Sequence, residues 1–104
     1  MKLFVDDIRN APDESWSVAR TNEQAVQALA MFQFAEVSLD HDMEGTPETF
    51  KPTAYFLGAK YTGSTKAPKI TLHTANPDGA SRMKNILKQY GISCEIRPIY
   101  DQNG

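Results

Sequence analysis

The chain has few of the features that mark secreted or membrane proteins, since its 104 residues contain one cysteine and no long apolar run. Cys94 has no second cysteine to pair with, and its place within a predicted strand indicates a buried thiol. No stretch approaches the roughly 20 apolar residues that cross a bilayer, and the start lacks the apolar region of a signal peptide. We therefore expect a protein of the reducing cytoplasm without a membrane partner.

The chain also lacks a large excess of charge of either sign, because its formal net charge is only −2 at pH 7. This balance gives no general attraction to nucleic acid, so duplex DNA is not expected as a partner. A phosphate-containing ligand needs local cations or a metal to hold it. The length fits one domain over residues 1–104, with a frayed tail at 100–104. The sequence leaves the oligomeric state open.

Apolar runs that alternate with helical patterns indicate the fold class. Short apolar runs predict strands at residues 3–6, 16–19, 37–40, 69–74 and 92–97. Of the helices expected after the second, third and fourth strands, the first opens with a capping box, Thr21 with Gln24. The second helix has Pro52 in its first turn, and the third starts at Pro77 and ends before Gly91. This alternation predicts an α/β fold of three layers with a mostly parallel five-stranded sheet.

The connection between the first two strands is short. Only residues 8–15 separate them, and Pro12 interrupts this segment. A parallel crossover usually needs a dozen or more residues. We therefore expect the first crossover helix to be missing or reduced to a single turn. The second strand could also run antiparallel, as a hairpin partner of the first.

Polar clusters follow three of the apolar runs, where each predicted strand ends. Ligands of open α/β sheets bind beyond the carboxyl ends of the strands, so these clusters predict a site at that rim. Carboxylates suit Mg²⁺, with Mn²⁺ as the alternative. A plainer interpretation is that acidic residues here only cap loops. The predicted metal ligands are Asp6, Asp7 and Asp42, with Asp40 beside them.

Candidate catalytic groups lie in the same clusters. The chain has two histidines, His41 and His73, and each adjoins a predicted strand end. Histidine is the commonest general acid or base near neutral pH, although both rings could simply bond their neighbours. Thr74 could donate its hydroxyl to a phosphoryl oxygen or to its own backbone. With Asp40, these three are the predicted catalytic residues.

Candidate ligand-binding groups complete the predicted site. Arg9 and Arg97 are possible phosphate clamps, because guanidinium matches phosphate in bidentate geometry. Either could instead pair with nearby aspartates. Asn76 is placed to cap the last helix, whose first N–H groups could bind an anion.

The order of these motifs resembles the receiver domain of response regulators. In that family paired acids follow the first strand, a phospho-accepting Asp ends the third, a Ser or Thr ends the fourth, and Lys-Pro ends the fifth. The matching residues here are Asp6-Asp7, Asp40, Thr74-Ala75 and Arg97-Pro98. Two features depart from that pattern. The first crossover is short, and Arg97 stands where the family has a lysine, although arginine and lysine are not chemically equivalent.

Further residues are similar to a divergent branch, the cyclic-phosphate processing receiver domain. They are Ile8-Arg9, residues 39–42 and residues 73–77. This resemblance implies the strand order 2-1-3-4-5. It also implies a receiver scaffold that binds or acts on a cyclic phosphate.

Three functions fit these residues, and the first is favoured. It is a metal-assisted hydrolase of the phosphodiesterase type, acting on a cyclic nucleotide or a 2′,3′-cyclic RNA end, with His41 and His73 as base and acid. The second is a regulatory receiver that is phosphorylated on Asp40. The third is a non-catalytic module that binds a nucleotide or a protein partner at the same rim.

Overall fold

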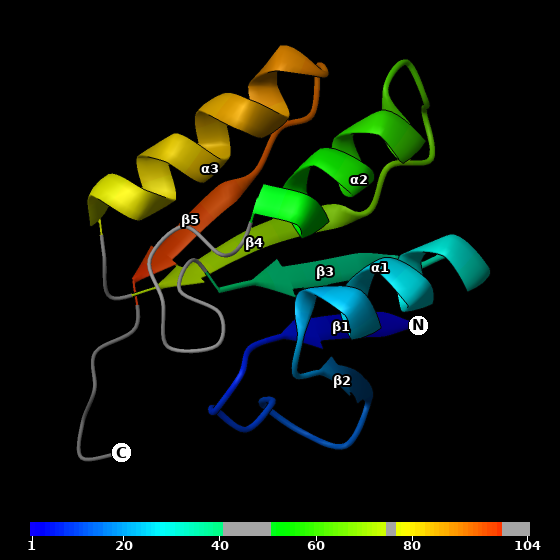
Figure 1. The fold of residues 1–104 in the computed structure, drawn as a ribbon, viewed down its shortest axis with the longest axis vertical. Helices are drawn as coiled ribbons and strands as arrows, with labels where there is room; N and C mark the ends of the chain where they lie inside the picture. The colour runs from blue at the N-terminus through cyan, green and yellow to red at the C-terminus, as the bar shows by residue number, and fades with distance from the viewer. Residues whose placement is uncertain (41–50, 75–76, 99–104) are drawn as a thin grey trace.

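A single parallel sheet organises the structure, a computed structural model that describes residues 1–40, 51–74 and 77–98. Its strands are β1 (Lys2–Val5), β2 (Trp16–Ala19), β3 (Glu36–Leu39), β4 (Lys69–Thr74) and β5 (Glu95–Pro98). They lie in the order β2-β1-β3-β4-β5, and every neighbouring pair is parallel (Figure 1). The predicted sheet and its order are confirmed. The direction of the second strand, open in the sequence, is parallel.

The first crossover contains no helix. Residues 6–15 carry the chain from β1 to β2 through bends and turns alone, as the short connection predicts. The Asp6 N–H donates to the carbonyl of Ala19 at 3.1 Å, which extends the pairing of the two strands by one bond. Arg20 ties the rest of the crossover down, because its guanidinium donates to the carbonyls of Asp6 at 3.1 Å and Arg9 at 2.6 Å.

Local signals in the sequence set the starts of the helices. These are α1 (Asn22–Met31), α2 (Lys51–Tyr61) and α3 (Pro77–Gln89). The Thr21 hydroxyl accepts the Gln24 N–H at 3.1 Å, and the Gln24 side chain accepts the Arg20 N–H at 2.7 Å, so α1 starts with reciprocal caps. Pro52 is tolerated in the first turn of α2. None of these helices is long and apolar enough to cross a membrane.

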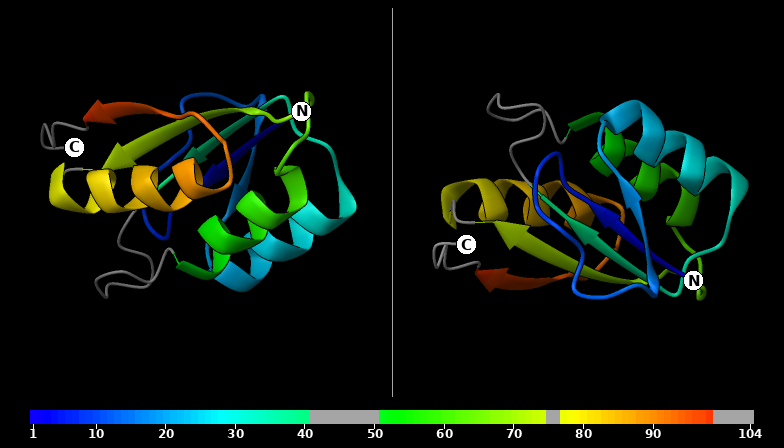
Figure 2. Two further views of the ribbon diagram at one scale, coloured as in Figure 1. Left: turned by 90° about the horizontal axis from the view of Figure 1, so that it is seen from above. Right: turned by 90° about the horizontal axis from the view of Figure 1, so that it is seen from below.

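The helices lie together on one face of the sheet, with α2 packed between α1 and α3 (Figure 2). Alternate strand residues point toward them and form one core with the inner faces of the helices. The largest of these core residues are Leu3, Leu29, Leu39, Leu57, Ile70, Leu72, Met83 and Leu87. Phe4 is equally buried but lies outside this core, since it points to the opposite face of the sheet.

The predicted α/β class is confirmed, but the described residues form two layers instead of three. Right-handed crossovers that advance across a sheet in one direction place their helices on one face. The connections from β2 to β3, β4 and β5 all advance in the same direction. Only the connection from β1 to β2 runs the other way, and it has no helix. We call the side of the sheet opposite the helices the open face; it carries Phe4, Trp16, Ser38, Thr71 and His73.

The last strand starts later than the sequence suggests. Gly91 has φ +77° and follows α3, as predicted, and the Ile92 N–H then donates to the carbonyl of Leu87 at 3.1 Å. This turn buries Ile92 in the core before the strand begins at Glu95, so the predicted start at residue 92 was wrong. Cys94 therefore precedes β5 instead of lying within it. Its thiol is partly buried, and that burial raises its pKa.

Candidate functional site

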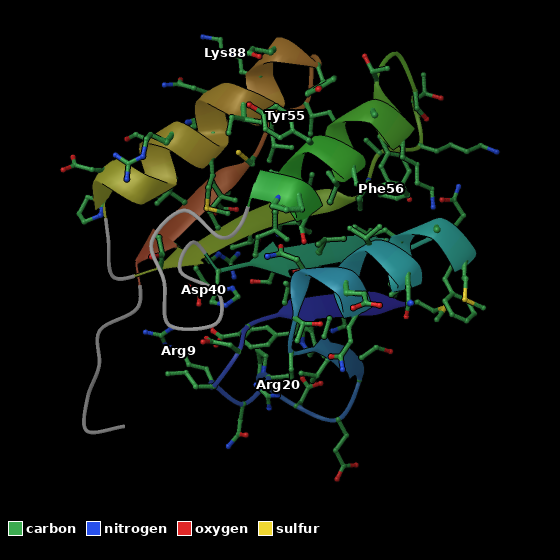
Figure 3. All side chains as sticks on the ribbon, viewed as in Figure 1. Arg9, Arg20, Asp40, Tyr55, Phe56 and Lys88 are labelled. Carbon is green, nitrogen blue, oxygen red and sulfur yellow. The ribbon has the colours of Figure 1, made fainter. Side chains whose placement is uncertain are left out.

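Three buried side chains from three neighbouring strands meet at the carboxyl end of the sheet. Asp6 follows β1, Asp40 follows β3, and His73 lies near the end of β4. Each offers one ligand atom within 4.8 Å of the others. Arg9 joins them, and Figure 3 shows it near Asp40 at this edge. We call Asp6, Arg9, Asp40 and His73 the rim cluster.

Asp6 is the most enclosed member of the rim cluster, with no exposed surface. One carboxylate oxygen accepts the backbone N–H groups of Ile8 and Arg9, both at 2.9 Å. The other accepts from His73 Nε2 at 2.9 Å and faces the Arg9 guanidinium at 3.4 Å. Burial raises the pKa of this carboxyl, but the bonds from His73 and from the two backbone N–H groups outweigh it and hold the pKa well below its usual range. Asp6 is therefore ionised at neutral pH.

His73 is held on both ring nitrogens. Because ionised Asp6 can only accept, Nε2 carries the proton that bonds it. Nδ1 lies 2.6 Å from the Ser38 hydroxyl, which donates to it when the ring is neutral. The ring also stacks on Phe4, with centroids 4.4 Å apart and planes 5° from parallel. The predicted histidine is thus fixed in one orientation between a serine and an aspartate.

Ser38 is a site residue that the sequence analysis missed. It is buried in the middle of β3, at a position on the open face. A hydroxyl within a run as apolar as Val37-Ser38-Leu39 needs a buried partner, and that requirement was the available signal.

Arg9 pairs with the acids, as one of its two predicted roles proposes. Its guanidinium lies 3.4 Å from Asp6 and 3.8 Å from Asp40, while 26 % of its side chain stays exposed. It therefore sits between the two carboxyls and still reaches solvent. A ligand oxygen can contact it from that side.

The other predicted residues lie at varying distances from this cluster. Thr74 is buried at the end of β4, and Asp7 is partly buried next to Asp6. Arg97 pairs at 3.5 Å with Glu95, and both side chains are exposed. In the register of β4 and β5, Arg97 lies beside His73. His41, Asp42 and Asn76 lie outside the described residues.

A divalent cation is compatible with the donors present. Carboxylate oxygens are the ligands that Mg²⁺ and Mn²⁺ prefer. The carboxylates of Asp6 and Asp40 and the His73 ring each offer one ligand atom within 4.8 Å of the others. A cation bound to these acids would compete with the Arg9 guanidinium, which faces both of them.

Comparison with known protein families finds a match over most of the sequence. A family model described as the cyclic-phosphate processing receiver domain matches residues 1–89 of the 104. This range includes every member of the rim cluster and all three helices. A search of curated proteins found no match. The chain belongs to the cyclic-phosphate processing receiver domain family.

Proposed function

We propose that this protein binds and hydrolyses a cyclic phosphate ester at the rim cluster, with a cyclic nucleotide or a 2′,3′-cyclic RNA end as substrate. The observation that carries the proposal is the meeting of two acids, an imidazole and a guanidinium within one buried cluster. These groups come from three separate parts of the chain, and such clusters of ionisable groups are typical of functional sites.

Charge balance supports a metal in this proposal. One guanidinium faces two acids, which leaves little positive charge for a phosphate anion. We assign Mg²⁺, or Mn²⁺, to Asp40 with Asp7 and Asp42 as further ligands. The bound cation supplies the positive charge that polarises the phosphate.

The protein groups then divide the chemistry. Arg9 donates to the phosphate oxygens, for which its planar guanidinium is suited. Asp40 accepts a proton from water as the water oxygen bonds to phosphorus. One ring P–O bond breaks, the leaving oxygen takes a proton from His41, and the product is a phosphate monoester. His73 positions Asp6 through Nε2, because both of its nitrogens are engaged.

The regulatory alternative has less support. Arg97, at the position of the receiver lysine, pairs with exposed Glu95 instead of facing Asp40.

Incubation with a panel of cyclic phosphates tests the proposal. The compounds are 3′,5′-cyclic mononucleotides, cyclic dinucleotides and RNA ending in a 2′,3′-cyclic phosphate, each with Mg²⁺, with Mn²⁺ or with a chelator. Chromatography of the products separates cleavage from retention. We expect one class to be opened to a monoester, and the chelator to suppress the reaction.

Variants link any activity to the rim cluster. Asp40→Asn is expected to lower the rate by about 100-fold, the usual effect of removing a general base. Glu14→Gln is the matched control, since it makes the same acid-to-amide change at an exposed residue of the first crossover. Binding without any product supports the non-catalytic alternative. Neither binding nor product in the whole panel overturns the proposal.

A further inference from the structure

We propose that the open face holds a pocket for the nucleobase of the ligand, next to the phosphate position at the rim cluster. The inference rests on the proposed function for the phosphate end of the ligand. The pocket itself is carried by separate observations on the open face, described below.

A cavity of about 360 Å³ lies on the open face, between the strands and the crossover of residues 6–15. This volume is at the lower end of the range for small-molecule sites and suits a ligand of a few rings. Phe4, Trp16, Glu36 and Thr71 line it. In a fold with a helix in the first crossover, that helix would cover this face; here residues 6–15 cross it without a helix, and the cavity lies between them and the strands.

Aromatic rings form part of the wall. The Trp16 ring meets Phe4 edge to face, with centroids 6.0 Å apart and planes at 77°. The Lys2 ammonium lies 5.0 Å from the centre of the Trp16 ring and supports it by a cation–π contact. Trp16 remains partly exposed. A flat ring from a ligand can pack on such a surface, as bases do on aromatic side chains.

An unpartnered hydroxyl points to a ligand with polar groups on its edge. Thr71 lines the cavity and is only 4 % exposed, yet its hydroxyl has no hydrogen-bond partner within the described part of the chain. Buried hydroxyls without a partner are rare, because burial removes their hydrogen bonds to water and no new hydrogen bond replaces them. Glu36, partly buried, lines the same cavity and can accept an N–H. A nucleobase offers both a stacking face and such edge groups.

The cavity is continuous with the rim cluster. Arg9 and His73 line it and belong to the cluster as well. A ligand with its phosphate at Arg9 can therefore extend its base along the open face toward Trp16. A site with both a cavity for a base and a position for a phosphate favours a nucleotide over inorganic phosphate.

Tryptophan fluorescence tests the pocket directly, because Trp16 is the only tryptophan. We titrate the protein with adenosine, guanosine, cytidine and uridine, which lack a phosphate, and with inorganic phosphate, which lacks a base. The emission is corrected for absorption by the nucleosides, and calorimetry repeats each titration. At least one nucleoside is expected to change the emission to saturation, whereas inorganic phosphate leaves it unchanged.

Two variants of Thr71 test whether its hydroxyl contributes to nucleoside binding. Thr71→Val removes it with little change in shape and is expected to weaken nucleoside binding by about three- to tenfold. Thr71→Ser keeps a hydroxyl and should bind within about twofold of the wild type. The valine variant should also melt no lower than the wild type, which separates lost binding from lost folding.

The outcomes for the pocket and for the function are distinct. The absence of a response to every nucleoside, or equal binding by Thr71→Val and the wild type, overturns the pocket. Cleavage of cyclic phosphates in that case leaves the proposed function intact. Nucleoside binding with no action on any cyclic phosphate supports the pocket and overturns the hydrolytic function.

Discussion

Asp6 connects several parts of the structure through a single side chain. Its two oxygens accept two backbone N–H groups of the crossover, the His73 ring and the Arg9 guanidinium. One carboxylate thus fixes the start of a loop with no helix, the orientation of a histidine and the place of an arginine. A charge so completely paired stabilises the fold only while it stays ionised.

This pairing predicts how stability depends on pH. The pKa of Asp6 is lowered in the folded state from an ordinary value of 3.8, so its contribution is present above about pH 4 and is lost as the pH falls below it. Asp6→Asn is expected to cost about 3 kcal/mol at pH 7 and to flatten the decline in acid. Urea unfolding at a series of pH values measures both effects, with Glu14→Gln as the control. An Asp6→Asn variant as acid-sensitive as the wild type contradicts this account.

Residues at strand ends could be predicted, whereas their partners could not. Asp6, Asp40 and His73 were found because each follows or ends an apolar run, and parallel strands bring such ends together. The two roles of Arg9 could not be separated, because they depend on the path of an irregular loop. Ser38 was missed because its hydroxyl faces a ring from a strand that is remote in sequence.

Among the elements, α2 packs closely at Gly58 against Tyr90, the residue that follows α3. A Cβ atom built there would lie 2.3 Å from Cδ2 of Tyr90. Glycine is normally unfavourable within a helix, by about 1 kcal/mol relative to alanine. Its presence here allows the Tyr90 ring to pack against the α2 backbone.

Gly58→Ala is therefore expected to destabilise the protein, although alanine favours helix. Overpacking by one methyl group against Tyr90 should cost about 1–3 kcal/mol net. In a Tyr90→Ala background the same change should be neutral or stabilising, since the obstructing ring is gone. Thermal unfolding of the four proteins in this cycle gives the result. Equal effects in both backgrounds would show that the ring is not the cause.

Element starts were predicted best where a cap marks them. Thr21 and Gln24 identified the start of α1, and Pro77 that of α3. The predicted start of β5 was wrong, because Ile92 is buried in the core before the strand begins and is not part of the strand. An apolar residue after a helix fits either interpretation until the turn at Gly91 is known.

At the scale of the molecule, the helices cover only one side of the sheet. The missing crossover helix was predicted from the length of residues 8–15 alone. The resulting two-layer arrangement was not predicted, because that step needs the strand order together with the handedness of the crossovers. In the described residues, the first crossover covers part of the open face where a helix could otherwise lie. Arg20 anchors this crossover.

Removal of that anchor should loosen the crossover and leave the rest of the sheet folded. Arg20→Ala deletes the donors to the carbonyls of Asp6 and Arg9, and we expect a loss of about 1–3 kcal/mol. Amide exchange of residues 7–15 should become about tenfold faster, while β3 and β4 keep their protection. Mass-detected hydrogen exchange measures this, with Lys88→Ala at the far end of α3 as the control. Uniformly faster exchange would indicate global destabilisation instead.

The chain of bonds from Ser38 through His73 to Asp6 also has a thermodynamic meaning. It joins a wall residue of the cavity to the anchor of Arg9, so neither end can rearrange without a response from the other. For the proposed ligand, this chain of bonds joins the position of the base to the position of the phosphate, and any effect of one on the affinity for the other is equal in both directions.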